Sequence, residues 1–167
     1  MTTVAWVVEG TWAGCVDAVR DWAPGGDDVL LLHVSAAEVT EAAAGALAGL
    51  MGRGRPRHRP RVEELTARGA ADLLAAAARR LGRPARTEAR SGRVEREVVA
   101  AADGARLLVV ARDGDRSRLG PPSLGAATRF VVDHAPCPVL LVWPDEIPAV
   151  ASMPPPPSQG QHPPPRP

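Results

Sequence analysis

VAWVVEGTWAGCVDAVRDWAPGGDDVLLLHV, residues 4–34, decides the fold because it reads as a strand, a helix and a second strand. Val4 to Val8 and Val29 to Val34 are short apolar runs, which are typical of strands buried on both faces. Between them, apolar residues recur at helical spacing after Thr11, a residue type that often caps helices, and Pro24-Gly25-Gly26 ends the helix. Such a βαβ unit predicts a right-handed crossover between parallel strands.

The rest of the chain continues the alternation. Further helices are predicted over 36–50, 62–81, 94–102 and 124–134, and further strands over 85–90, 105–110 and 139–143. The strand at 85–90 carries small and polar residues and is expected at a sheet edge. The pattern predicts an α/β fold, a single-domain, doubly wound sheet of five mostly parallel strands in a three-layer, nucleotide-binding-like sandwich.

The composition changes at Pro144. Residues 1–143 are predicted to form the domain, and residues 144–167, which hold ten of the 18 prolines, a disordered, extended C-terminal tail. We interpret this Pro-rich tail as a solvated tether, with a proline-recognising protein partner as the alternative.

The charge and the apolar pattern of the chain argue against a nucleic-acid-binding or membrane-associated protein. The 167 residues are 45% hydrophobic and carry a net charge of +1, so no overall attraction to nucleic acid or to an anionic membrane is expected. The N-terminus lacks a charged start before a long apolar run, and no segment is long enough to span a membrane, so a cytoplasmic protein is expected. Cys15 and Cys137 are predicted to be two buried thiols rather than a redox pair.

One local stretch is strongly basic. The Arg-rich loop at 52–61 contains five arginines and His58, which would suit RNA, DNA or an acidic partner. No aromatic residue is interleaved for base stacking, so a solvated loop between helices is favoured and nucleic acid is not expected as a partner.

Side chains for catalysis are not grouped in the sequence. The four histidines have no metal-ligand spacing, and the chain contains neither a Gly-x-Ser-x-Gly elbow nor a loop ending in Gly-Lys-Ser/Thr. We therefore expect no enzyme, no metal and no catalytic residues.

Ligands of open α/β sheets bind at the carboxyl ends of the strands, where the strand order reverses. The turns expected there are Glu9-Gly10-Thr11, Ser35 and the loop 111–125. This loop delivers Gly125 to a helix start, where backbone N–H groups favour an anion, and Arg112, Arg116 and Arg118 add positive charge. A flexible surface loop is the alternative.

Several stretches together resemble the universal stress protein family over about residues 3–143. They are VVEGT (7–11), LLHV (31–34), ARLLVVARDG (105–114), the LGAAT helix start (124–128) and HAPCPVLLV (134–142), the last being the most specific.

The resemblance implies a strand order of 3-2-1-4-5 and a homodimer that pairs the last strands, here Val139 to Trp143. One branch of the family binds ATP through an acidic residue after the first strand and a loop of the form Gly-x-x-Gly-(nine residues)-Gly-Ser/Thr, and the other branch does not. Carried over to this sequence, the cofactor-binding positions are Glu9, Gly10, Thr11, Val34, Val110, Ala111, Gly114, Gly125, Ala126 and Ala127.

The sequence departs from the ATP-binding pattern. Glu9 replaces an Asp, Ala111 replaces the first loop glycine, ten residues separate Gly114 from Gly125, and Ala126 lacks the hydroxyl. Asp113 also places a negative charge beside the expected phosphates. The favoured function is a stress-response regulatory or interaction module with a degraded phosphate loop that binds ATP weakly or not at all, and the alternative is an ATP-binding sensor.

Overall fold

The structure, a computed structural model, describes residues 1–37 and 59–155. The strands are β1 (Thr2–Trp6), β2 (Asp28–Ala36), β3 (Arg86–Gly92), β4 (Leu107–Ala111) and β5 (Val139–Val142). The helices are α1 (Trp12–Trp22), α3 (Arg59–Leu81), α4 (Val94–Ala101) and α5 (Ala126–His134), with 3-10 turns η1 (Pro121–Ser123) and η2 (Val150–Ser152).

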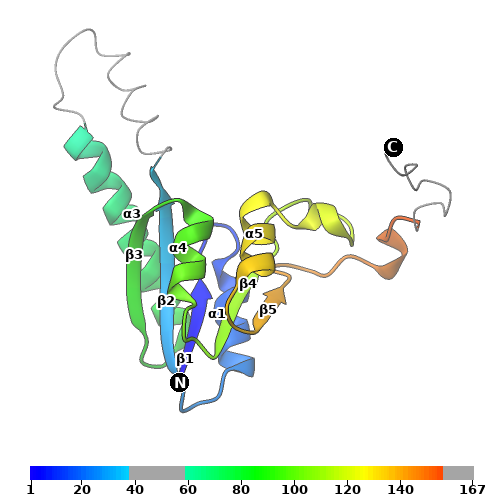
Figure 1. Cartoon of the computed structure of the whole chain (residues 1–167), viewed down its shortest axis with the longest axis horizontal. Helices are drawn as coiled ribbons and strands as arrows, with labels where there is room; N and C mark the ends of the chain where they lie inside the picture. The colour runs from blue at the N-terminus through cyan, green and yellow to red at the C-terminus, as the bar shows by residue number, and fades with distance from the viewer. Residues whose placement is uncertain (38–58, 156–167) are drawn as a thin grey trace, which may run out of the picture.

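The strands form one sheet in the order β3-β2-β1-β4-β5 (Figure 1). All four neighbouring pairs are parallel. The predicted fold class and strand order are confirmed. Because the chain moves from β1 toward β3 and then returns to β4 on the other side, the strand order reverses between β1 and β4.

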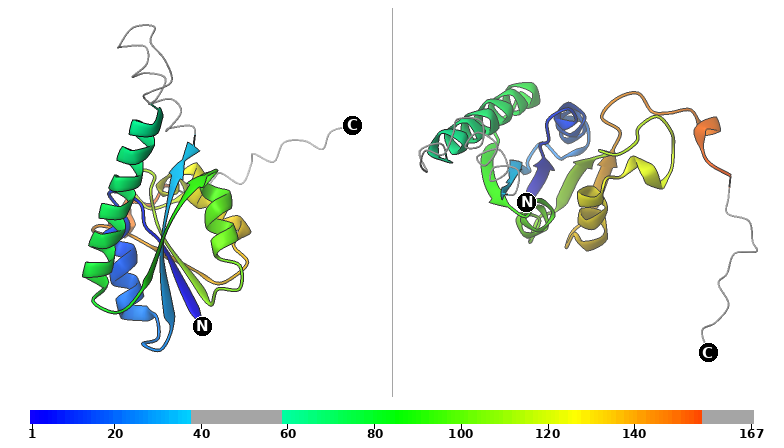
Figure 2. Two further views of the ribbon diagram at one scale, coloured as in Figure 1. Left: turned by 90° about the vertical axis from the view of Figure 1, so that its left-hand side faces the viewer. Right: turned by 90° about the horizontal axis from the view of Figure 1, so that it is seen from above.

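Helices cover both faces of the sheet, as the view from above shows (Figure 2). One core lies between the sheet and helices α1 and α3, and the other lies between the sheet and helices α4 and α5. Neighbouring residues of β2 serve opposite cores, because Leu31 packs in the first and Leu32 in the second. This is why the strand reads as a continuous apolar run, and each such buried leucine stabilises the fold by about 1.5–3 kcal/mol.

The weakest strand prediction is confirmed as an edge strand. β3 pairs with β2 from Leu30 opposite Arg86 to Ala36 opposite Gly92, and its residues are half-buried or exposed. Its small and polar sequence follows from this position, since only one of its backbone edges is paired within the described sheet.

Some local expectations differ from the structure. Helix α3 begins at Arg59, so the last three residues of the 52–61 stretch are helical, with Pro60 in the first turn, where proline is tolerated. The predicted helix at 36–50 and the rest of the Arg-rich loop lie almost wholly outside the described residues. Thr11 stands at the N-cap position of α1, as predicted, but its hydroxyl donates back to the Val8 carbonyl at 3.4 Å and makes no capping hydrogen bond to the helix.

The two thiols differ in burial. Cys15 is fully buried in the α1–α3 core, and this burial raises the pKa of its thiol to about 12. Cys137 is half-buried, and its pKa is raised in the same direction by desolvation. Both cysteines are free. The prediction of two buried thiols therefore holds fully only for Cys15.

The first residues of the expected tail contact the domain. Residues 144–155 lie beside the loop after β4, and η2 falls within them (Figure 1). Residues 156–167 lie outside the described part, so the disordered tail stays a prediction. Within residues 1–37 and 59–155, no helix has the length and apolar character to cross a membrane.

Candidate functional site

The loops that follow β1 and β4 both leave the sheet at its carboxyl edge. Val4 pairs with Leu108 and Ala5 with Val109, so the two strands run side by side into these loops. The expected ligand position of this fold is therefore formed by the turn around Glu9 and by the loop from residue 111 to Gly125, hereafter the β4 loop.

The β4 loop closes on itself. The Gly114 N–H donates to the Ser123 carbonyl at 3.0 Å, and the Asp115 N–H donates to the Pro122 carbonyl at 2.8 Å. A Cβ at Gly114 would clash with the Pro122 carbonyl oxygen and lie 2.8 Å from the carbonyl carbon of Ser123. Gly114 thus permits close packing of the loop backbone, and its N–H is already hydrogen-bonded within the loop.

The start of helix α5 is occupied by a carboxylate of the same loop. The Gly125 N–H donates to Asp113 Oδ1 at 2.7 Å. A helix N-terminus carries unpaired N–H groups and a partial positive charge, which is the environment an anion prefers. The Asp113 carboxylate therefore holds the position where an incoming phosphate would be expected.

Arg112 points toward the segment after β5. Its Nη1 donates to the hydroxyl of buried Ser123, and its guanidinium lies 4.7 Å from the centroid of the Trp143 ring. The ring face attracts the cation, and the hydroxyl fixes its direction. The Ser123 hydroxyl in turn donates to the Gly120 carbonyl at 2.7 Å.

The other two arginines of the loop are also paired. Arg116 Nη1 lies 2.7 Å from Asp145 Oδ2, and Arg118 Nε donates to Asp115 Oδ2 at 3.1 Å. The hydrogen bonds from Ser117 and the charge of Arg118 hold the pKa of Asp115 below its usual range. The positive charges that the sequence placed near a phosphate thus have carboxylate, hydroxyl or aromatic partners.

The structure separates the remaining predicted site residues. Val34, Val110 and Ala111 are buried in the cores, whereas Glu9 and Gly10 are exposed. Gly10 has a φ of +79°, a left-handed conformation that suits glycine. Thr11 is buried with its hydroxyl turned to Val8, while Ala126 and Ala127 stand in the first turn of α5.

Glu9 faces a different hollow from the β4 loop. It lines a cavity of about 400 Å³ with His33 and Ser35 of β2 and with residues of α3, and no residue of the β4 loop lines it. His33 Nδ1 lies 2.8 Å from the Val7 carbonyl, which can only accept, so Nδ1 carries the proton. The Ser35 hydroxyl lies 3.4 Å from the other ring nitrogen.

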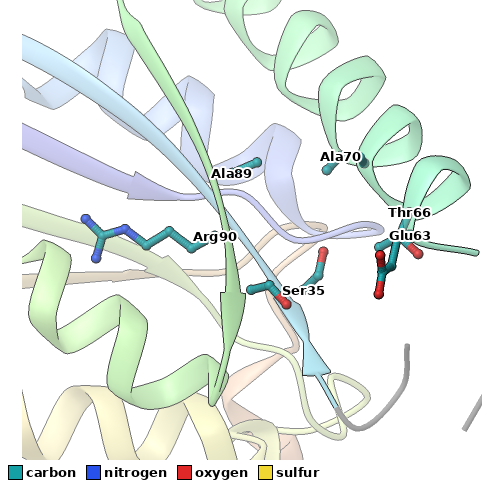
Figure 3. Close-up of a pocket in the computed structure, with 8 residues that line it drawn as sticks. Ser35, Glu63, Thr66, Ala70, Ala89 and Arg90 are labelled. Carbon is teal, nitrogen blue, oxygen red and sulfur yellow. The ribbon is translucent and has the colours of Figure 1, made fainter. Parts of the chain in front are cut away.

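A second, smaller cavity of about 220 Å³ adjoins the first between α3 and the ends of β2 and β3. Figure 3 shows Ser35, Glu63 and Thr66 around it, with Ala70 and Ala89 above them. The Arg90 side chain extends away from this space (Figure 3). Its Nε donates to Glu88 Oε1 at 2.7 Å. The described residues contain no group of His, Cys, Asp and Glu side chains arranged to hold a metal.

Three contributors to the β4 loop were missed from sequence. Asp145 and Ser152 come from the segment that was expected to begin the tail, Trp143 is the last residue of the predicted final strand, and each of the three contacts the loop. The one available signal was the acidic pair Asp145-Glu146, placed directly after the last strand in a proline-rich stretch and opposite in sign to the arginines of the loop.

The chain is similar to proteins of known family and structure. The sequence profile of the universal stress protein family matches residues 17–142. No curated protein was found to match the sequence.

Several solved structures share the fold. Hypothetical protein MJ0577 is 16% identical, with 85% of this chain and 95% of that chain covered and a TM-score of 0.63. A universal stress protein in complex with cAMP is 17% identical, with 87% and 98% covered and a TM-score of 0.53. Universal stress protein UspA from Lactobacillus plantarum is 19% identical, with 84% and 97% covered and a TM-score of 0.50. At these identities the likeness concerns the fold.

Proposed function

The chain belongs to the universal stress protein family, and we propose that it works in the cytoplasm as a non-catalytic regulatory or protein-interaction module whose β4 loop does not hold ATP. Some members of the family bind ATP and others do not, and the proposal places this chain among those that do not. Whether the chain can bind ATP depends on whether the backbone N–H groups of the β4 loop are free to donate to its phosphates.

One observation carries the proposal, namely the hydrogen bond from the Gly125 N–H to the Asp113 carboxylate at 2.7 Å. A phosphate at the start of α5 has to displace this carboxylate and then lie close to its negative charge. The Gly114 N–H is directed to Ser123, so the second loop glycine retained from the ATP-binding pattern also has an internal acceptor.

Two further features weaken phosphate binding. Ala126 offers no hydroxyl, and a hydrogen bond to a charged acceptor contributes about 1.5–3 kcal/mol. Arg116 has to give up its 2.7 Å contact with Asp145 before it can contact a nucleotide. Both effects add to the displacement of Asp113.

An ATP-binding sensor is the alternative function. Its support is the presence of Gly114 and Gly125, the first-turn N–H groups of α5, and the fold shared with a universal stress protein solved in complex with cAMP. In this alternative, the nucleotide replaces the Asp113 carboxylate and orders the loop around its phosphates.

Isothermal titration calorimetry with Mg-ATP, and separately with cAMP, distinguishes the two functions. We expect no saturable heat from the native chain at millimolar nucleotide. Asp113→Ala/Ala126→Ser should bind ATP more tightly than its matched control Ala126→Ser, because only the double variant frees the Gly125 N–H. Native binding with a Kd near or below about 10 μM, roughly −7 kcal/mol, would instead establish the sensor.

We also infer a homodimer formed through β5. This strand lies at the edge of the sheet, is entirely apolar and has four half-buried residues. The β4 residues Leu108 and Arg112 donate to the carbonyls of Pro138 and Val142, so the alternate residues Val139 and Leu141 direct their N–H groups outward. An apolar edge with free N–H groups is suited to pairing with a second copy.

Sedimentation equilibrium tests the dimer. Leu141→Pro removes an outward N–H and should yield monomers, whereas Leu141→Ala, which shortens the same side chain but keeps the N–H, should remain dimeric. A native chain that is monomeric at high micromolar concentration would contradict this part of the proposal.

A further inference from the structure

Residues 143–155 leave β5 and run beside the β4 loop, and both project beyond the β5 edge of the sheet (Figures 1 and 2). The contacts are spread along the loop. Trp143 stacks on Arg112, and Asp145 pairs with Arg116 at 2.7 Å. Farther along, the Ser152 hydroxyl accepts a hydrogen bond from the Leu119 N–H at 3.1 Å.

The Ser152 contact is directional. Its hydroxyl donates to the Ala149 carbonyl at 2.7 Å within the η2 turn, which leaves an oxygen lone pair for the Leu119 N–H. Gly120 follows with a φ of +120°, and a Cβ there would lie 3.5 Å from Pro154 Cδ. Residues 119–120 of the β4 loop therefore contact Ser152 and Pro154, at and just after the end of η2.

The first two residues of the segment, Trp143 and Pro144, pack against Gly14 of helix α1. A Cβ at Gly14 would lie 2.7 Å from Pro144 Cα and 3.3 Å from the Trp143 carbonyl oxygen. The absence of a side chain at Gly14 allows the chain to leave β5 close to the start of α1 and to turn toward the loop. The segment is thus held at its root, at its middle and at η2.

The same segment buries little apolar surface. Its large apolar side chains are exposed, with 65% of Ile147, 76% of Val150 and 58% of Met153 accessible. The Asp145–Arg116 pair also lies at the surface, where ion pairs contribute little. Because a few polar contacts provide most of its attachment, this segment can separate from the β4 loop without disturbing the two cores.

We propose that residues 143–155 are an intramolecular clasp that holds the β4 loop in its closed form. The inference rests on the proposed function and names its regulation. With the clasp in place, Arg112 and Arg116 face Trp143 and Asp145, and the loop keeps Gly114 on Ser123 and Gly125 on Asp113. Release of the clasp frees the arginines and loosens the N–H groups of the loop.

Hydrogen exchange measured by mass spectrometry on shortened chains tests the clasp. Deletion of 144–167 removes most of it, whereas deletion of 156–167, the matched control, leaves it whole. We expect exchange across 113–125 to rise at least tenfold in the first chain and to stay at the native rate in the second, with β1, β2 and β4 equally protected in both. Equal exchange of the loop in the two chains would overturn the proposal.

Point variants of the full chain provide the test if the shorter chain fails to fold. Asp145→Ala and Ser152→Ala each remove one clasp contact and should each speed exchange in the β4 loop. Glu146→Ala truncates the neighbouring acidic side chain but keeps the pair between Asp145 and Arg116, so it should leave exchange unchanged. Identical exchange in all three variants and the native chain would contradict the clasp.

The clasp and the proposed function fail in different experiments. Tight ATP binding by the native chain would overturn the proposed function whatever the exchange data show. Unchanged loop exchange after deletion of 144–167, combined with no ATP binding, would remove the clasp and leave the proposed function intact.

Discussion

The two flanks of the sheet's carboxyl edge differ in how they use their polar groups. On the β4–β5 flank, the N–H groups of Gly114 and Gly125 have acceptors within the β4 loop. On the β2–β3 flank, two adjoining cavities of about 400 and 220 Å³ remain beneath α3. A glycine pattern therefore predicts the shape of a loop, but the neighbouring side chains decide whether a ligand can use it.

Gly114→Ala should have the largest effect on the closed flank. The added Cβ meets the backbone of Pro122 and Ser123, which cannot move aside as a flexible side chain can. We expect a loss of about 2 kcal/mol in the free energy of unfolding, measured by urea denaturation. Native stability in this variant would mean that the loop is not closely packed.

Asp113→Ala should have the next largest effect. It removes the acceptor of the Gly125 N–H, and a single hydrogen bond typically contributes about 1 kcal/mol to stability. Asp113→Asn keeps an acceptor oxygen and is the control, so it should lose less stability by urea denaturation. Equal losses would show that the charge of Asp113, and not the hydrogen bond, stabilises the loop.

The fold could be predicted from sequence because buried strands are marked locally. Leu31 and Leu32 pack in opposite cores, so consecutive residues of β2 have to be apolar. The resulting apolar run can be recognised in a single sequence. Helix faces were less certain. Trp22 and Leu65 fall at helical spacing with buried residues of α1 and α3, yet they are 75% and 61% exposed. Periodicity cannot tell which of two neighbouring apolar stripes the sheet will cover.

Ala70→Leu tests the open flank and should have a smaller effect. Ala70 is buried in α3 and lines both cavities, so a larger side chain has space to enter. Leucine is also a good helix former, and we expect the free energy of unfolding to change by less than about 1 kcal/mol. A loss as large as that of Gly114→Ala would show that the space is not available.

Asp17→Asn should have the smallest effect. Arg80 Nε and Nη2 donate to the two carboxylate oxygens of Asp17 at 2.9 and 2.7 Å, and this hydrogen bonding holds the pKa of Asp17 below its usual range. Because the folded pKa is lowered, the stabilisation is present at neutral pH and is lost as pH falls through that pKa.

Urea denaturation of the native chain and Asp17→Asn at neutral and acid pH measures this difference. The two proteins should differ slightly at neutral pH and converge in acid, and high salt should reduce the difference because the pair is at the surface. A difference that grows in acid would have the wrong sign.

The candidate site was only partly predictable. Spacing located Gly114 and Gly125, and the acid at position 113 was recognised as unfavourable to phosphate. Its bond to Gly125 depends on the loop folding back through Pro121-Pro122, and the contacts of Asp145 and Ser152 depend on where the chain turns after β5. Proline content predicts an extended segment but carries no information about what that segment touches.

The most direct measurement of the central claim is nitrogen–proton NMR of the Gly114 and Gly125 amides during titration with Mg-ATP. If these N–H groups are held by Ser123 and Asp113, both resonances should stay in place at millimolar nucleotide. Saturable shifts of both resonances would show that ATP displaces Asp113, and the chain would then be a nucleotide sensor.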